Sequence, residues 1–296
     1  MDLAWQPGAL LVSPLFESLW PVLRECPAAG FPGTADLDAL ASRHGIRNAN
    51  GTVIRFVPDE SSRRREPDSQ YEVRVYRDGT VPTRCENWHD LFNALVWITF
   101  PRTKAELNRV HYREIMARCS TPGREARNTD SGSRGMAHTD SGSRGTARDV
   151  ITLFDEGGVV VACGEPELSR LLREFCLKDL FWWQRNRVQR AMRFFVFGHA
   201  ILEKGLQPYK GLTAKALVLD VPMAHFRQPL DARLADVDAA AARYFSRAES
   251  LVSTRGLSPL PLEGVPGWCP ANEDGAFYDD VTVFRPGRIR SGRKLA

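Results

Sequence analysis

The chain has 296 residues, of which 43% are hydrophobic and 26% are charged, and its formal net charge is +4 at pH 7. These proportions are those of an ordinary globular protein, and they exclude a fibrous or wholly disordered chain. The basic excess is local, because residues 285–296 hold five Arg or Lys residues and no acidic residue. Such a tail is interpreted as a solvated terminus; the alternative is a weak anchor for nucleic acid or an anionic surface. In neither case is strong binding of nucleic acid expected.

The six cysteines include no Cys-x-x-Cys pair, and a chain of this size is expected to keep them reduced. The first residues lack the basic segment that begins a signal peptide. No apolar run approaches the roughly 20 residues of a membrane helix. The sequence therefore predicts a cytoplasmic protein with no membrane partner.

Two helices are predicted near the start of the chain. The first opens at Ser13-Pro14, because proline is favoured at the first position of a helix. The second covers residues 34–44 and ends at Gly45, since glycine readily adopts the left-handed conformation that closes a helix.

Strands are predicted next, at residues 51–57 and 70–76, on either side of an arginine-rich loop. Asp78-Gly79 is typical of a hairpin turn, and a further short strand is expected to end near Thr83.

A largely apolar helix with a polar stripe is predicted over residues 88–100, with Asn87 as its N-cap. His89, Asp90 and Asn93 fall on one arc of this helix. Because an unpaired buried polar group is costly, the stripe marks either a functional site or a structural polar network.

Pro101 is expected to end that helix, and Thr103 with Glu106 is expected to form a capping box for another helix that reaches about Cys119. Residues 120–147 then contain the sequence Thr-Asp-Ser-Gly-Ser-Arg-Gly twice. Small polar residues of this kind cannot bury a core, so a flexible repeat loop is predicted rather than a phosphate-binding element.

The second half of the chain mixes strands and helices, and its first feature is a turn at Asp155-Glu156-Gly157-Gly158. The expected elements that follow are strand 159–162, helix 166–176, a mostly helical segment 179–206, strand 216–221, helix 231–250 and strand 281–284.

His199 and Glu203 are the second polar pair that the sequence singles out. They lie four residues apart within the segment predicted to be helical, so they are expected to share a face with Met192 and Phe195. A histidine and a carboxylate in such a setting suit a metal-ligand pair or a histidine base oriented by the carboxylate. Asp155 is a further candidate, because catalytic carboxylates often lie on turns at the end of a strand.

Several common mechanisms are disfavoured by the absence of their motifs. The sequence contains no phosphate-binding Gly-rich loop with its lysine, no Gly-x-Ser-x-Gly and no His-Glu-x-x-His. Common nucleotide-binding, serine hydrolase and zinc protease mechanisms are therefore not expected.

Five long motifs stand out within roughly residues 50–225: Val81–Arg84, Asn87–Trp97, Phe100–Ala105, Thr152–Gly158 and Phe197–Ala200. In these motifs the chain resembles an uncharacterised bacterial family, domain of unknown function 3025. The resemblance implies an intracellular protein of bacterial, more narrowly proteobacterial, origin, and it implies no activity.

The predicted fold is α+β, with helices around a small mixed or antiparallel sheet. A single globular domain is expected over residues 1–285, with the flexible repeat loop 120–147 inside it. Residues 286–296 are expected to form a flexible basic tail.

Two functions are compatible with these residues. The first is a metal-assisted hydrolase, with catalytic groups among His89, Asp90, His199 and Glu203, and metal ligands among His89, Asp155, His199 and Glu203. Oxygen and imidazole ligands suit a divalent metal, which is the candidate cofactor. The second is a non-catalytic binding or regulatory module in which these side chains form a structural network. The ligand and substrate are left open by the sequence.

Overall fold

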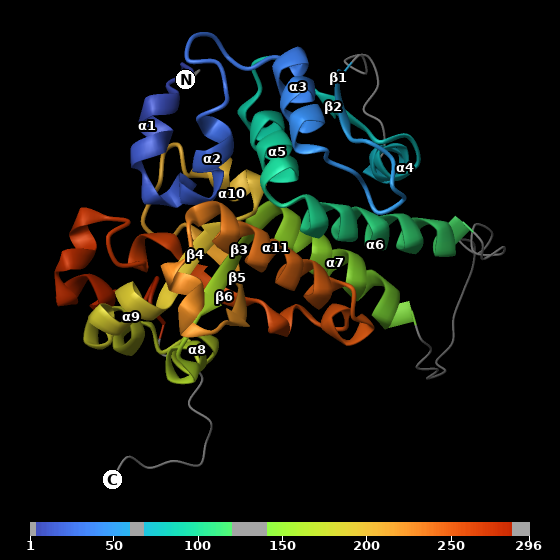
Figure 1. The fold of residues 1–296 in the computed structure, drawn as a ribbon. Helices are drawn as coiled ribbons and strands as arrows, with labels where there is room; N and C mark the ends of the chain where they lie inside the picture. The colour runs from blue at the N-terminus through green and yellow to red at the C-terminus, as the bar shows by residue number, and fades with distance from the viewer. Residues whose placement is uncertain (1–3, 60–67, 120–140, 286–296) are drawn as a thin grey trace, which may run out of the picture.

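A four-stranded mixed sheet runs through the lower half of the molecule as drawn in Figure 1. The computed structural model describes residues 4–59, 68–119 and 141–285. In the order β4-β3-β5-β6, β3 pairs parallel with β5, and the other two pairings are antiparallel. Every residue of β3 is buried, as expected for a strand covered on both faces. The strands are β3 (Gly158–Cys163), β4 (Met192–Val196), β5 (Thr213–Asp220) and β6 (Ser258–Pro261).

Three helices pack against this sheet: α7 (Ser141–Gly157), α8 (Pro166–Arg173) and α11 (Leu230–Phe245). Phe154 of α7 contacts both the segment after β4 and the helix α11. Its ring lies 4.8 Å from that of Phe197 and 4.7 Å from that of Phe245. The buried side chains form one continuous core.

The upper half of the molecule contains a smaller, two-stranded sheet. β1 (Arg55–Pro58) pairs parallel with β2 (Thr80–Thr83), and the chain crosses between them through α4 (Asp68–Asp78). The strand predicted at residues 70–76 is therefore wrong, and so is the hairpin at residues 78–79. The alternating apolar residues suited a strand, but parallel pairing needs a crossover, and α4 supplies it.

The N-terminal segment differs in detail from its prediction. Residues from Pro14 form a 3-10 helix to Leu19 that continues as α2 (Trp20–Leu23), and an additional short helix, α1 (Pro7–Val12), precedes them. The helix α3 (Thr34–His44) has the predicted bounds, and Gly45 ends it with φ of 62°.

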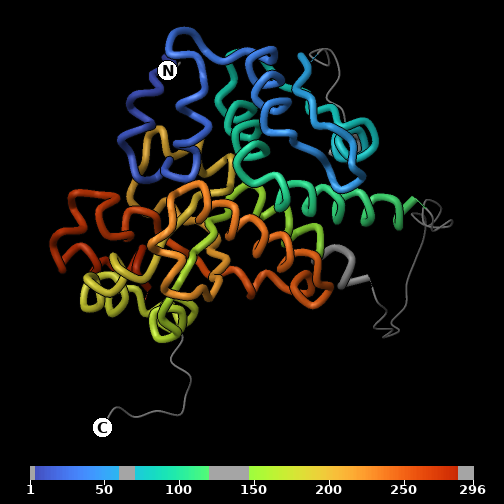
Figure 2. The backbone as a smooth tube through the Cα atoms, viewed as in Figure 1, coloured from blue at the N-terminus to red at the C-terminus, as the bar shows by residue number. Residues whose placement is uncertain are grey.

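The helices α5 (Trp88–Thr99) and α6 (Pro101–Cys119) follow each other almost without a break. The Asn87 side chain accepts a hydrogen bond from the Asp90 backbone N–H, which confirms the predicted N-cap. The predicted capping box is wrong, because Pro101 already begins α6 and Thr103 binds the Asp238 carboxylate instead. The tube in Figure 2 shows α6 running alongside α7.

The segment 179–206 is mostly helical, as predicted, but the strand β4 interrupts it. A turn of π-helix at Asp179–Trp183 and α9 (Arg185–Ala191) lead into β4, and only α10 (His199–Lys204) follows. Consequently Met192 and Phe195 lie on a strand, and the predicted face that they share with His199 does not exist. The aromatic and β-branched residues of β4 favour a strand once β3 is available to pair with it.

Near the C-terminus, the strand predicted at 281–284 is a turn, in which the Val283 and Phe284 backbone N–H groups bind the Asp280 carbonyl. The edge strand β6 was not predicted, because its two prolines argue against a strand anywhere except at a sheet edge.

The α+β class with a small mixed sheet is confirmed. The arginine-rich loop, most of the repeat loop and the basic tail lie outside the described residues, and α7 begins at Ser141, within the range predicted as loop. None of the helices within the described ranges combines the length and the apolar composition that a membrane-spanning segment needs.

Candidate functional site

A cavity of about 490 Å³ lies where α4, α5, α6, α7 and α10 meet. Its wall is strongly polar and carries charges of both signs. The ionisable side chains that line it are Asp59, Tyr71, Glu72, Arg74, Arg84, His89, Asp90, His111, Arg148, Asp155, Glu156 and His199.

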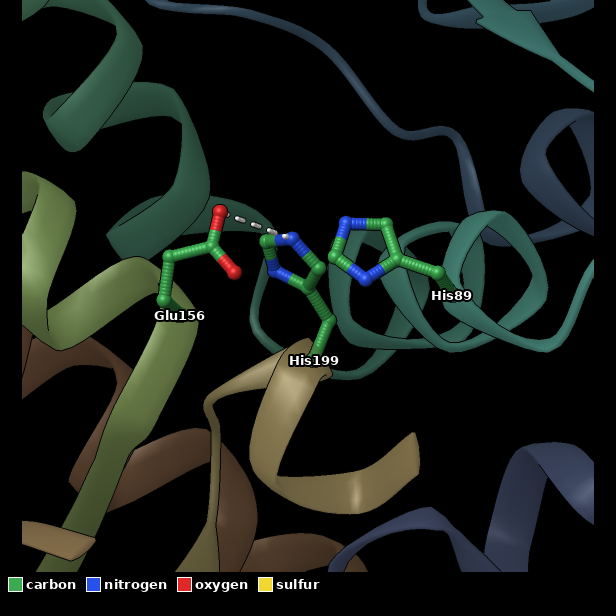
Figure 3. Close-up of side chains that lie close together, drawn as sticks. All are labelled: His89, Glu156 and His199. Carbon is green, nitrogen blue, oxygen red and sulfur yellow. Dashed lines mark ion pairs between the residues drawn. The ribbon is translucent and has the colours of Figure 1, made fainter. Parts of the chain in front are cut away.

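Three of these side chains converge on one point of the wall. His89, Glu156 and His199 each offer one ligand atom, and these atoms all lie within 4.8 Å of one another. Nε2 of His199 is 3.5 Å from Oε1 of Glu156, and the two imidazole rings are 4.4 Å apart, edge to face. Figure 3 shows His199 between the other two side chains.

His89 is placed by the start of α5. It follows the N-cap residue Asn87 and lies in the first helical turn. The neighbouring Asp90 is held by Arg84, whose backbone N–H, Nε and Nη2 donate to its two carboxylate oxygens at 2.8, 2.9 and 2.7 Å. Asp90, a predicted catalytic residue, thus anchors the loop before α5.

His199 is placed by a close approach of two backbones. Gly198 lies against the turn between α7 and β3, where a Cβ atom would come within 2.5 Å of the Glu156 carbonyl oxygen and the Gly158 nitrogen. The Gly158 carbonyl accepts hydrogen bonds from the Phe197 and Gly198 N–H groups at 2.9 and 2.8 Å. This contact brings the first residue of α10 beside the last turn of α7, so that His199 meets Glu156.

Glu156 and Asp155 are adjacent but differ in their surroundings. The Glu156 side chain is 46% exposed; burial works against its ionisation, but the neighbouring His199 outweighs this and lowers its pKa. Asp155 accepts a hydrogen bond of 2.6 Å from Lys104 Nζ, in a pair whose side chains are 19% and 5% exposed. Burial alone would raise the pKa of Asp155, but the charges of Lys104 and His199 lower it below its usual value.

A chain of hydrogen bonds continues from this ion pair to Asn93 and Tyr71, which both line the cavity. Lys104 Nζ also donates to Asn93 Oδ1 at 2.9 Å, and Asn93 Nδ2 donates to the Tyr71 hydroxyl at 3.1 Å. Burial and the charge of Glu72 raise the pKa of Tyr71 above its usual range. Asn93 therefore belongs to a structural network, one of the two interpretations that the sequence left open.

Each histidine of the trio also faces a second carboxylate through Nδ1. Nδ1 of His89 is 3.0 Å from Oε2 of Glu203, whose side chain is 44% exposed. Nδ1 of His199 lies 3.9 Å from Oδ2 of Asp155 and has no hydrogen-bond partner among the described residues. Glu203 thus contacts His89 rather than its helical neighbour His199.

The fold brings all of the candidate residues chosen from the sequence into one region, but it groups them differently. His89 and His199 meet, whereas Asp90 is engaged by Arg84, Asp155 by Lys104, and Glu203 by His89. Glu156 was not among the selected ligands, although the sequence had placed it on the same turn as Asp155.

The chain matches the sequence model of one protein family. That family is described as Protein of unknown function (DUF3025), and the match covers residues 54–288. The chain belongs to this family. The match contains His89, Glu156 and His199, so the whole trio of this DUF3025 protein lies inside the family's region. No curated protein matches the chain. No solved structure matches it either.

Proposed function

We propose that this DUF3025 protein is a hydrolase that uses a divalent metal ion held by His89, Glu156 and His199. The observation that carries the proposal is the convergence of their three ligand atoms within 4.8 Å at the wall of a cavity. Two ligands about 2.1 Å from a tetrahedral ion are about 3.4 Å apart. The separation of 3.5 Å between His199 Nε2 and Glu156 Oε1 is close to this value.

The ligand types support this chemistry. Two imidazoles and one carboxylate are a ligand set of catalytic zinc sites, in which the fourth position is left for water. A metal in such a site lowers the pKa of the bound water and makes it a nucleophile at neutral pH. The same set also suits iron(II), so the identity of the metal is part of the test.

The nearby carboxylates take supporting roles in this proposal. A ligating histidine usually donates its other ring N–H to a carboxylate, which fixes its tautomer and orientation. Glu203 is positioned to do this for His89, and Asp155 for His199. This assignment moves Glu203 and Asp155 from direct ligands to groups that orient the ligands, and it gives Asp90 no catalytic role.

The test is metal binding by the purified protein, stripped of metal and then titrated with Zn²⁺, Mn²⁺ or Fe²⁺ in a calorimeter. Wild type should bind one ion per chain. Since loss of a group that only orients a ligand already costs 10–100-fold in affinity, Glu156→Gln should cost more than about 100-fold. Glu167→Gln, on the exposed side of α8, is the matched control and should bind as wild type does.

Turnover is then measured with metal-loaded protein on aryl phosphates and aryl acetates. Hydrolysis that is lost in Glu156→Gln and kept in Glu167→Gln is expected. A wild-type protein that binds none of the ions, or a Glu156→Gln variant that binds them equally well, would refute the proposal.

The alternative is a non-catalytic binding or regulatory module. The observation that favours it is the chain from Asp155 through Lys104 and Asn93 to Tyr71, whose hydrogen bonds are complete without any added ion. If no metal binds, this network serves to hold the surrounding helices in one arrangement, and the cavity is a pocket that binds a ligand without catalysis.

A bacterial cytoplasmic location is proposed on separate grounds. All six cysteines are free, as expected in a reducing compartment, and the motifs resemble a bacterial family.

A further inference from the structure

We propose that Glu72 is a further catalytic residue of this cavity, the group that gives a proton to the leaving group of the substrate. The inference rests on the proposed hydrolase function. In that function the metal ion activates the attacking water, and Glu72 is assigned the protonation of the leaving group. It gives Glu72 a task that neither the metal ligands nor the groups that orient them perform.

Glu72 is positioned in the wall of the cavity that also holds the trio. It comes from α4, and its side chain is 16% exposed. Oε2 accepts a hydrogen bond of 2.6 Å from Asn108 Nδ2, and Oε1 lies 3.9 Å from Nε2 of His111. Asn108 also donates to the Glu72 backbone carbonyl at 3.0 Å, so that one side chain of α6 holds both ends of the residue.

The partner of Glu72 suits a carboxyl group that changes its protonation state. The amide of Asn108 is neutral, so it holds the group without forcing ionisation, whereas Lys104 holds Asp155 as a carboxylate. Burial raises the pKa of Glu72 to about 7; the bond from Asn108 opposes this and the charge of Asp155 adds to it. Two carboxyl groups in one site whose surroundings separate their pKa values commonly divide the acid and base roles.

Other charged groups face Glu72 from the neighbouring helices. Lys104 and His111 face it from α6, and Arg148 and Asp155 face it from α7. Tyr71 precedes Glu72 on α4 itself. Lys104 and Arg148 favour ionisation of Glu72, and Asp155 disfavours it. With burial included, the carboxyl group is poised between its two forms near neutral pH, where a general acid is most effective.

The proposed step balances as an ordinary hydrolysis. Metal-bound water loses one proton to solvent, and the resulting hydroxide oxygen forms a bond to the electrophilic centre of an ester. The bond from that centre to the leaving oxygen breaks, and the electron pair on this oxygen takes the proton of the Glu72 carboxyl group. Solvent then returns a proton to Glu72, and the net reaction consumes one water molecule.

The experiment compares two leaving groups on Zn²⁺-loaded holoprotein. Nitrophenolate leaves without a proton, whereas phenolate, with a conjugate-acid pKa of about 10 as in tyrosine, needs one. Phenyl and p-nitrophenyl phosphates, and the two corresponding acetates, are the probes. Glu72→Gln should lower kcat/KM for the phenyl ester by about 10²–10⁴-fold, the usual contribution of a general acid. The same substitution should lower kcat/KM for the nitrophenyl ester less than about tenfold. The variant protein should bind Zn²⁺ as wild type does.

A second measurement does not depend on turnover. Infrared difference spectra over a pH titration should show a carboxyl group titrating near pH 7 in wild type. The signal should be absent in Glu72→Gln and present in Glu167→Gln. Wild-type activity on the phenyl ester should decline as the pH rises through this value, and this decline should be missing in Glu72→Gln.

The outcomes separate the two proposals. Loss of metal in Glu156→Gln tests the metal site, and it is independent of Glu72. If wild type binds metal and hydrolyses the probes, but Glu72→Gln slows both leaving groups equally or the neutral titration is absent, the inference about Glu72 is refuted alone. If metal-loaded wild type hydrolyses no probe, the proposed function and the role of Glu72 are refuted together.

Discussion

Replacing Lys104 by Met should strongly destabilise the protein. The change keeps an unbranched side chain that is one atom shorter, but it removes the only charge that hydrogen-bonds Asp155 in the described structure, at 2.6 Å. Lys104 is 5% exposed and Asp155 19% exposed, so water does little to screen the carboxylate that remains. Removing one partner of a buried ion pair costs about 3–5 kcal/mol. With an unfolding entropy of about 2.1 cal/mol/K per residue, this corresponds to a fall of about 5–8 °C in Tm.

The assay is urea unfolding of wild type, Lys104→Met, Asp155→Asn and the double variant. The double variant should recover most of the lost stability, because it leaves no unpaired charge behind. The pH dependence has a defined sign. Without Lys104, burial should raise the folded-state pKa of Asp155 above its unfolded value, so the proton is held better in the folded state. The destabilisation by Lys104→Met should therefore be largest at high pH and shrink as the pH falls.

A cost of less than about 1 kcal/mol for Lys104→Met at pH 8 would refute a buried ion pair, since that is the range of an exposed ion pair. Failure of the double variant to recover stability would also contradict it. In that case, the contact of Lys104 with the Trp97 ring, at 5.5 Å, would be the interaction that matters.

Three further predictions concern the site and the repeat. Glu203→Gln should weaken Zn²⁺ binding by about 10–100-fold with little change in Tm, because Glu203 is 44% exposed and acts only through His89; calorimetry and thermal melting check this. Gly198→Ala should destabilise by about 1–3 kcal/mol and weaken metal binding as well, since its Cβ would meet the backbone of Glu156 and Gly158 at 2.5 Å; unchanged affinity would show that the backbone contact does not set the site. Deleting one copy of the repeat, residues 129–138, should leave Tm within about 1 °C, because that stretch has almost no apolar residues to contribute to a core; a larger loss in a thermal melt would contradict it.

Local signals in the sequence predicted the elements that local interactions stabilise. Asn87 was predicted to cap α5 and does so, and Gly45 was predicted to end α3 and has the left-handed conformation expected there. A cap is formed by residues within a few positions of one another, so its physics is contained in a short stretch of sequence.

The elements that were mispredicted depend on partners far along the chain. Residues 70–76 alternate in a way that suits a strand, yet they form α4, because the parallel pair β1 and β2 needs a crossover. The opposite error occurred at Met192–Val196, which became a strand by pairing with β3. The wrong prediction for α4 also concealed Glu72, because a strand at residues 70–76 offers no reason to expect this residue in the wall of the cavity.

The choice between Asp155 and Glu156 shows a different limit. Both were visible on the predicted turn, but adjacent residues at the end of a helix point about 100° apart. Both line the cavity, but the Asp155 side chain is 19% exposed and the Glu156 side chain 46% exposed. This difference depends on Lys104, which binds Asp155. Lys104 lies 51 residues away in the sequence and reaches Asp155 only in the folded chain.

The contrast between two groups of side chains is the strongest reason to look for a bound ion at the trio. The buried chain of Asp155, Lys104 and Asn93 is held by hydrogen bonds of 2.6 and 2.9 Å, so it needs no further partner to be stable. In the trio, His199 Nε2 stands 3.5 Å from Glu156, and its buried Nδ1 makes no hydrogen bond within the described residues. Leaving a buried polar atom unsatisfied costs about 1–3 kcal/mol. No buried side-chain atom of Asp155, Lys104 or Asn93 is left without a hydrogen bond in this way. A cation between the three ligands would need a ligand separation of about 3.4 Å, which His199 Nε2 and Glu156 Oε1 already approach at 3.5 Å, and it would fix the proton of His199 on Nδ1, where Asp155 can accept it.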